Sequence, residues 1–356
     1  MPTEPREPAA ATSSAQPAGA QAPLPDPGFE NTALAYAHRS SPELKRSLVL
    51  FKSLRSRALA QLGPPLLETA LNLGLPIRGL VRRFFYDQFV GGRNLGECEL
   101  TIQKLHTHGV HSILDYAVEA EQSSAGFDRV MAEVKRIIDY AKAHPAVPFV
   151  AMKLSGLGPL DELHKRQQGH NLGAREQEQY EAMRARLEEL CRYALEREQS
   201  VYIDAEESWT QDETDALCEE MMIRFNRELP IVYTTVQMYR KDRLAYVKAL
   251  FRRVRQRQAI PGVKLVRGAY LEKENRRAAR QGYPSPIQPN KAATDRDFNQ
   301  AMAYILERLD NFGLCLGTHN EHSCRLAAGQ VEAGQHPRGH PHLWISQLFG
   351  MADHIS

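Results

Sequence analysis

The amino-acid sequence predicts an α/β protein, and three observations favour a (βα)8 barrel of the TIM type. Short apolar or β-branched runs alternate with longer amphipathic segments beyond residue 86, as in parallel strands joined by crossover helices. No Gly-x-Gly-x-x-Gly fingerprint follows an early strand, which disfavours an open dinucleotide-binding sheet. Polar residues stand at the ends of successive predicted strands, and all loops at that end of a barrel open on one face. These residues are Asp115, Lys153, Asp204, Gln237, Arg267, His319 and Gln347.

Seven strands can be placed along the chain. They are residues 112–116, 149–154, 200–204, 231–236, 263–266, 314–318 and 343–347. The main helical segments are 127–142, 176–197, 212–228, 243–257, 294–312 and 321–333. No eighth strand is found before Ser356, and an unclosed barrel leaves two bare strand edges. We therefore expect an incomplete barrel that lacks its C-terminal βα unit.

Two segments precede the predicted barrel, which occupies residues 85–356. Residues 1–28 are rich in Pro and Ala, a composition typical of a disordered tail, and match neither a secretory signal nor a mitochondrial presequence. Residues 29–84 form a predicted helical section. Ser41-Pro42-Glu43 begins one helix, and a second follows Gly63-Pro64.

Composition excludes several classes of protein. The 356 residues are 42% hydrophobic and 25% charged, with a net charge of +2, which is the balance of a soluble globular protein. No apolar run reaches the roughly 18 to 20 residues that a membrane span needs. The five cysteines never stand in Cys-x-x-Cys spacing, so they favour a reducing compartment over a disulfide framework or zinc site. The arginine-rich run 252–257 alternates with apolar residues and predicts a solvated helix face, not a nucleic-acid site.

Lys153 and Asp204 stand at neighbouring strand ends and carry opposite charges. Together they could bind a zwitterion, with Lys153 at a carboxylate and Asp204 at an ammonium group. The alternative is an internal ion pair between the two side chains.

A second group of residues suits an anionic cofactor. Gln237 offers an amide that both donates to and accepts from the polar edge of a planar heterocycle. Lys264 and Arg267 place fixed positive charge at one strand end, and Gly268 lets the backbone approach a bulky ligand; the alternative is a basic surface strand. The run Thr318-His319-Asn320 leads into a helix, whose N-terminus favours phosphate.

Eight motifs, in order and spacing, resemble the proline dehydrogenase family, closest to its single-function eukaryotic-type branch. The motifs are Gln88-Phe-Val-Gly-Gly92, Ser112-Ile-Leu-Asp-Tyr-Ala-Val-Glu119, Lys153-Leu-Ser-Gly156, Asp204-Ala-Glu-Glu207, Thr234-Thr-Val-Gln-Met-Tyr239, Lys264-Leu-Val-Arg-Gly-Ala-Tyr270, Gly317-Thr-His-Asn320 and Gln347-Leu-Phe-Gly-Met351. Any one of them is weak, but eight in sequence over about residues 84–356 are specific.

The resemblance implies a distorted (βα)8 barrel that binds FAD non-covalently, oxidises L-proline to 1-pyrroline-5-carboxylate and passes electrons to a quinone, with peripheral membrane contact. It implies a bacterial cytoplasmic location, or the mitochondrial matrix side in a eukaryote. The implied substrate residues are Lys153 at the carboxylate, Asp204 at the amine, Leu348 in the apolar wall and Glu119 as a gating acid. The implied cofactor residues are Gln237, Lys264, Arg267, Gly268, Thr318, His319 and Asn320, and no metal is implied.

The sequence departs from the family at its end. The family carries a Tyr-Leu-x-Arg-Arg-x-x-Glu-Asn motif whose arginines hold the substrate carboxylate, and this motif is absent here. Loss of such charge-assisted bonds costs about 2 to 5 kcal/mol, so we expect weak or no activity from the chain as printed.

Two other functions remain open at this point. One is a metal-dependent barrel lyase or hydrolase that uses Asp115, Asp204, Glu206 and His319 as ligands. The other is a flavin-binding barrel without catalysis. The spacing of His106, His108 and His111, and of His336, His340 and His342, does not favour a metal site.

Overall fold

The computed structural model describes residues 28–55, 79, 85–116, 121 and 123–355. The predicted helix after Gly63-Pro64, the predicted tail before Gly28 and the predicted site residue Glu119 lie outside the described residues.

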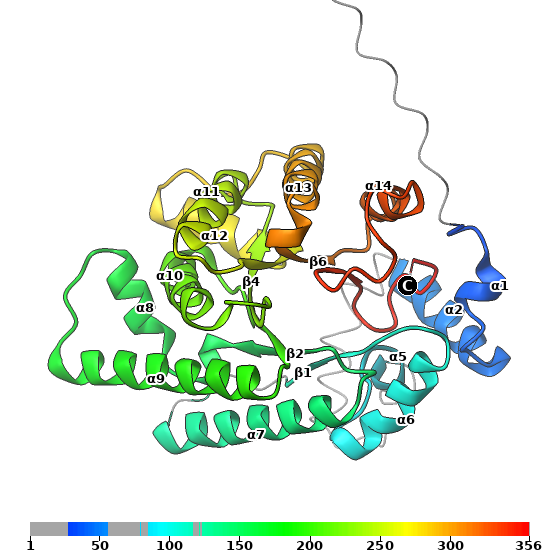
Figure 1. Ribbon diagram of the computed structural model, residues 1–356, viewed down its shortest axis with the longest axis horizontal. Helices are drawn as coiled ribbons and strands as arrows, with labels where there is room; N and C mark the ends of the chain where they lie inside the picture. Colours follow the sequence, from blue (N-terminus) through cyan, green and yellow to red (C-terminus); the bar gives the residue numbers. More distant parts are fainter. Residues whose placement is uncertain (1–27, 56–78, 80–84, 117–120, 122, 356) are drawn as a thin grey trace, which may run out of the picture.

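Seven parallel strands form one sheet in chain order (Figure 1). They are β1 (Ile113–Asp115), β2 (Phe149–Lys153), β3 (Ser200–Asp204), β4 (Val232–Gln237), β5 (Gly262–Val266), β6 (Gly313–Gly317) and β7 (Leu343–Ser346). Each predicted strand is present, with its boundaries within one residue of the prediction. The prediction of a TIM-type α/β fold is confirmed.

The sheet curls so far that its two ends approach each other. The ring of Phe149 in β2 lies 5.3 Å, between centroids, from the ring of Trp344 in β7, and His111, just before β1, lies 5.6 Å from the same Trp344 ring. Among the described strands, no backbone pairing joins β1 to β7. The described residues therefore form a curled, unclosed barrel of seven strands.

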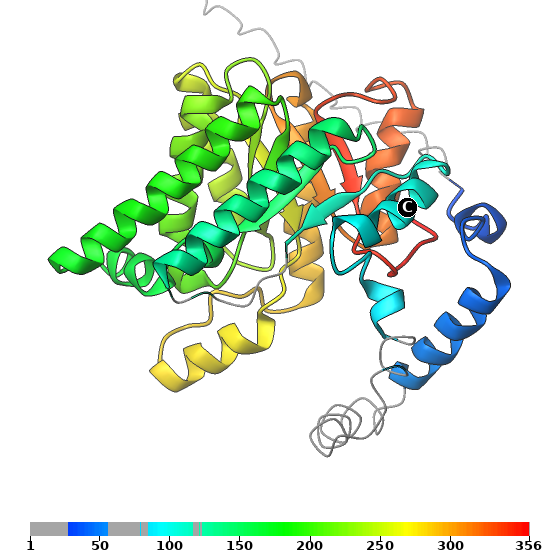
Figure 2. The same ribbon diagram turned by 90° about the horizontal axis from the view of Figure 1, so that it is seen from below.

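Helices cover the convex face of the sheet, and a further group lies near its first and last strands (Figures 1 and 2). They are α1 (Thr32–Ala35), α2 (Ser41–Arg55), α5 (Asp87–Phe89), α6 (Leu95–His106), α7 (Ser124–Ala143), α8 (Leu160–Gln167), α9 (Ala174–Glu196), α10 (Ser208–Phe225), α11 (Arg243–Gln256), α12 (Leu271–Gln281), α13 (Lys291–Leu306) and α14 (Glu321–Glu332). In the part of the chain that the structure describes, no helix is long and apolar enough to cross a membrane.

Alternation along the strands separates the two faces of the sheet. In β3, Val201 and Ile203 belong to the large core between sheet and helices, whereas Tyr202 belongs to a small aromatic cluster on the concave face. Because side chains alternate along a strand, Asp204 points to the same face as Tyr202. The concave face thus carries packed rings at the bottom and charged groups at the ends of the strands.

Several helix boundaries differ from the prediction. Helix α10 begins at Ser208 instead of residue 212, and α13 ends at Leu306, followed by a short 3-10 turn at Leu309–Asn311. Helices α8 and α12 were not predicted. Helix α12 was missed because of its composition, since most of its residues are charged or polar and only Glu274 and Ala278 in it are buried.

Gln88, the first residue of the first motif, connects the N-terminal helices to the segment after β7. Its side chain is buried, and its Oε1 accepts from Ser47 Oγ at 2.6 Å and from Arg39 Nη1 at 3.2 Å. Its Nε2 donates to Gly350 O at 2.6 Å. This motif is structural, because it joins two parts of the chain that lie far apart in sequence.

Candidate active site

The ends of β2 to β5 bring four polar side chains to one rim of the concave face. Lys153 and Asp204 are register partners in β2 and β3. Thr235 in β4 donates from Oγ1 to Asp204 Oδ1 at 2.9 Å, and the Lys264 ammonium group in β5 forms an ion pair with the same oxygen. Since both donors use Oδ1, no described residue hydrogen-bonds to Asp204 Oδ2. We call Lys153, Asp204, Thr235 and Lys264 the rim cluster.

Lys153 is the unmatched charge of the rim cluster. Among the described residues it has no hydrogen-bond or ion-pair partner, whereas the expected alternative was an ion pair between Lys153 and Asp204. The structure gives Asp204 a different partner, Lys264. Asp115 at the end of β1 lies within electrostatic range: its pKa is raised by loss of hydration and by the Asp204 charge, and is lowered by Lys153 and Lys264.

Gln237 links the loop after β3 to the segment after β5. Its side chain is buried, with Nε2 donating to Glu206 O at 2.7 Å and Oε1 accepting from the Ala269 N–H at 3.2 Å. A primary amide has a second N–H and a second lone pair, so Gln237 keeps one donor and one acceptor for a ligand edge.

Arg267 stands beside the N-terminus of α14. Its Nε donates to Asp295 Oδ1 at 2.7 Å, its Nη2 donates to Ser323 Oγ at 2.9 Å, and its Nη1 donates to Thr318 Oγ1. Asn320 is the N-cap of α14, where its Oδ1 accepts from the Ser323 N–H at 3.0 Å. A guanidinium group beside a helix N-terminus is a favourable environment for phosphate.

Gly268 has a backbone conformation that other residues rarely adopt. Its φ is +124°, and a Cβ atom there would lie 2.5 Å from ring atoms of Tyr239. The chain can therefore turn closely over Tyr239 only with glycine at this position.

The segment after β6 and the segment after β7 meet at His319. The Leu348 N–H donates to His319 Nε2 at 3.3 Å, and burial lowers the pKa of His319. The Leu348 side chain is 68% exposed, and its role in the apolar wall stays a prediction.

No role was expected for Tyr270, and Glu206 was expected only as a ligand in the metal-dependent alternative. Burial raises the pKa of Tyr270 to about 12, with Glu206, Glu207 and Asp204 adding to the shift. Burial also raises the pKa of Glu206, although its Oε1 accepts from the Ser155 N–H at 3.2 Å. Both residues lie inside motifs of the resemblance, which was the available signal. The described residues contain no group of three or more His, Cys, Asp or Glu side chains that could hold a metal ion.

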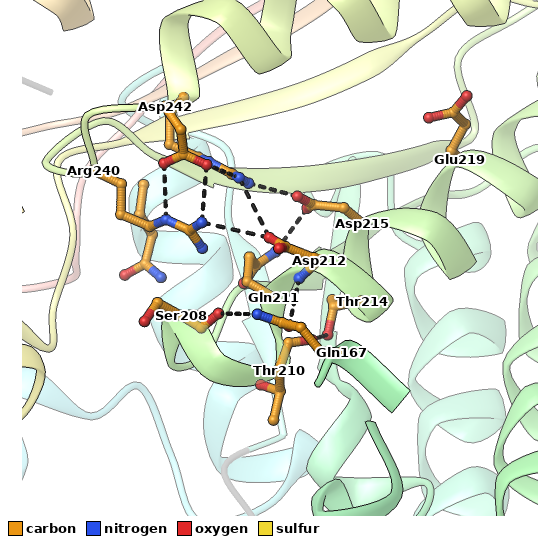
Figure 3. Close-up of polar contacts among 12 residues, drawn as sticks. Gln167, Ser208, Thr210, Gln211, Asp212, Thr214, Asp215, Glu219, Arg240 and Asp242 are labelled. Atoms are coloured by element: carbon orange, nitrogen blue, oxygen red, sulfur yellow. Dashed lines mark hydrogen bonds and ion pairs between the residues drawn. The ribbon is translucent and has the colours of Figure 1, made fainter. Parts of the chain in front are cut away.

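A second charged cluster joins α10 to the segment after β4 and the start of α11 (Figure 3). Arg243 forms ion pairs with Asp215 and Asp242. Arg240 donates to the carboxylates of Asp242, at 2.9 Å, and Asp212, at 3.4 Å. We call these five residues the outer cluster. The Arg243 and Asp215 side chains are only 5% and 6% exposed.

Comparison with known proteins gives a consistent result. A family model described as proline dehydrogenase matches residues 98–356. The carbapenem antibiotics biosynthesis protein CarD of Pectobacterium carotovorum is 33% identical over 270 residues, which cover 75% of this chain and 69% of that protein. The mitochondrial proline dehydrogenase 1 of Dictyostelium discoideum is 26% identical over 372 residues, or 92% of this chain and 65% of that protein.

Solved structures resemble the fold. The proline utilization A protein of Bdellovibrio bacteriovorus, inactivated by N-propargylglycine, matches with a TM-score of 0.69 and 19% identity over 91% of this chain and 34% of that chain. This chain thus spans about two thirds of the curated relatives and about a third of the solved chain.

Proposed function

Since the chain belongs to the proline dehydrogenase family, we propose that the protein oxidises L-proline to 1-pyrroline-5-carboxylate with FAD as cofactor and a quinone as electron acceptor. The observation that carries the proposal is the rim cluster. Lys153 has no hydrogen-bond or ion-pair partner among the described residues, although its charge acts on Asp115 and Glu206. It lies beside an aspartate that keeps one carboxylate oxygen unused.

The rim cluster suits a small zwitterion. In the proposed complex, Lys153 binds the proline carboxylate and Asp204 Oδ2 accepts a hydrogen bond from the amine. Lys264 and Thr235 hold Asp204 in place through Oδ1, so the carboxylate need not reorient when the substrate arrives. Asp204 can therefore bind the substrate amine through Oδ2 while Oδ1 fixes the orientation of the carboxylate.

The residues at the end of β4, β5 and β6 fit FAD. Arg267 and the N-terminus of α14, capped by Asn320, supply positive potential for the pyrophosphate. Gln237 retains a donor and an acceptor for the edge of the isoalloxazine, and Lys264 supplies positive charge near it. When bound, FAD supplies the hydride acceptor that no side chain of the protein can provide.

Spectroscopy tests the proposal. The purified protein, incubated with FAD, is expected to retain a flavin absorbance band through gel filtration, and anaerobic L-proline is expected to bleach that band. Bleaching detects a slow reaction as well as a fast one, so low turnover does not hide it. Retention of flavin with no bleaching would support the flavin-binding barrel without catalysis, and a colourless protein inhibited by chelators would support the metal-dependent alternative.

The choice of substrate and acceptor needs two further measurements. A relative from Xenopus laevis, 25% identical over 89% of this chain, is a hydroxyproline dehydrogenase, so 4-hydroxyproline should be compared with proline in the same assay. Reoxidation of the reduced protein by a soluble quinone, with and without vesicles, tests the proposed acceptor and the proposed contact with a membrane surface.

A further inference from the structure

The first turn of α10 begins directly after the segment that carries Asp204. Only three residues separate Asp204 from Ser208, the first residue of the helix. The position of this turn therefore controls where the Asp204 segment lies. The first N–H groups of a helix have no partner within the helix, so they need acceptors from elsewhere.

Glu274 of α12 supplies such an acceptor. Its Oε1 accepts from the Ser208 N–H and its Oε2 accepts from Ser208 Oγ, both at 2.6 Å. The Glu274 side chain is fully buried, at 0% exposed. A carboxylate that accepts from a helix N-terminus in a buried place forms strong, directional hydrogen bonds.

Two other contacts hold the same turn and are weaker candidates for this role. Gln167 of α8 accepts from the Asp212 N–H at 3.0 Å and donates to Ser208 O at 2.9 Å (Figure 3), but α8 carries no residue of the rim. Lys273 pairs with Glu207, but its side chain is 59% exposed, and exposed ion pairs contribute little.

The backbone of Glu274 is also connected to a segment near the rim. Tyr270 is the residue that immediately precedes α12, and its carbonyl accepts from the Glu274 N–H at 2.9 Å. Glu274 therefore connects the segment after β3 to the segment after β5. Tyr239, which follows β4, lies so close to Gly268 in the segment after β5 that a Cβ atom at Gly268 would meet its ring.

We infer that Glu274 is a positioning residue of the proposed active site, which holds the segments of Asp204 and Tyr270 relative to each other through its bonds to Ser208. The inference rests on the proposed function. Glu274 reaches the site only through Ser208 and α12. Its loss should weaken the binding of proline more than the chemical step, because Asp204 already contacts the substrate in the ground state.

Three variants test this inference on the flavin-loaded protein. Glu274→Ala is expected to raise KM for proline about ten-fold, the scale of one lost charge-assisted hydrogen bond, with kcat changed less than about three-fold. Glu274→Gln keeps the side-chain volume and one acceptor oxygen, so its KM should fall between that of the alanine variant and wild type. Glu272→Ala is the matched control, since Glu272 is an exposed glutamate on the same helix.

Hydrogen exchange provides a readout that does not depend on activity. The amides of residues 205–212 are expected to exchange faster in Glu274→Gln than in Glu272→Ala. Glu274→Gln also answers the question if the alanine variant does not fold.

The two possible failures are distinguishable. Wild-type protein whose flavin is not bleached by proline contradicts the proposed function. If wild type is active and Glu274→Ala has the same KM as Glu272→Ala, the inference alone is overturned. Where the alanine variant does not fold, the same comparison is made with Glu274→Gln. A loss confined to kcat overturns it too.

Discussion

The rim cluster and the outer cluster are built from the same residue types, yet they differ in how completely their charges are matched. In the outer cluster, Arg243 forms ion pairs with Asp215 and Asp242. Arg240 also binds Asp242 (Figure 3). Every charged group of the outer cluster has an ion-pair partner, although the buried Arg240 Nη1 has no hydrogen-bond partner. In the rim cluster, Lys264 binds one oxygen of Asp204, and Lys153 has no described ion-pair partner, which leaves capacity for a ligand.

The difference follows from position in the fold. The outer cluster joins α10 to the start of α11, where buried ions must be paired because burial removes their hydration. The rim cluster lies where the strands of a barrel end, the place at which loops from several strands can close around a substrate. Charge by itself therefore does not distinguish the two clusters, and incomplete pairing is the observation that favours the proposed site at the rim.

The largest expected effect is on stability, from the outer cluster. Arg243→Met should lower the free energy of unfolding by about 3 to 5 kcal/mol, because it leaves the buried Asp215 carboxylate without its cation. Denaturation by urea measures the change. Arg253→Met is the control: the Arg253 side chain is 47% exposed in its pair with Glu219, and such pairs contribute about 0 to 1 kcal/mol. Equal losses in both variants would remove the distinction between a buried and a solvated pair.

The second effect should appear in binding and not in stability. Lys153→Met removes a cation that has no described hydrogen-bond or ion-pair partner, so the free energy of unfolding should change by less than about 1 kcal/mol. Proline binding should weaken by about 2 to 5 kcal/mol, or from roughly 30-fold to several thousand-fold, because the substrate carboxylate loses its charged partner. Titration of the flavin spectrum with proline measures the affinity. Unchanged affinity would show that Lys153 does not bind the carboxylate.

The third effect separates backbone shape at the rim from charge. Gly268→Ala should destabilise the protein by about 1 to 3 kcal/mol and weaken FAD binding, since the new Cβ would meet the Tyr239 ring in an unfavourable backbone conformation. Gly282→Ala is the matched control, because Gly282 also has a positive φ, +72°, but no atom lies within 4 Å of its Cβ position. Thermal melting compares the two. Equal shifts in both variants would mean that the contact with Tyr239 has no effect.

The strands were predictable because their apolar runs and alternation are local signals. The same alternation predicts that Lys153, Asp204 and Lys264 point to the concave face. It does not predict which lysine reaches Asp204. That choice depends on the curl of the sheet, which no single segment encodes.

The beginning of α10 and the whole of α12 were not predictable for a related reason. The side chains that satisfy the first turn of α10 come from Gln167 and Glu274, far away in the sequence. Helix α12 contacts its neighbours mainly through charged residues, among them Glu274 and Lys273, so its sequence resembles a solvated segment. Local propensity and apolar periodicity carry no information about such contacts.

The smallest expected effect concerns Asp115 at the rim. It tests whether an ionised carboxylate is unfavourable there, in contrast to the paired carboxylates of the outer cluster. The pKa of Asp115 is raised, first by loss of hydration and then by Asp204. Because the pKa of Asp115 is raised in the folded state, its favourable contribution to the free energy of unfolding is complete below the unfolded pKa of about 3.8. That contribution is lost as pH rises through the folded-state pKa. Asp115→Asn should therefore stabilise the protein at pH 7, by less than about 1 kcal/mol because Asp115 lies on an exposed edge strand. Melting curves should converge with those of wild type below pH 4; a variant less stable than wild type at pH 7 would show that the ionised carboxylate is favourable at the rim.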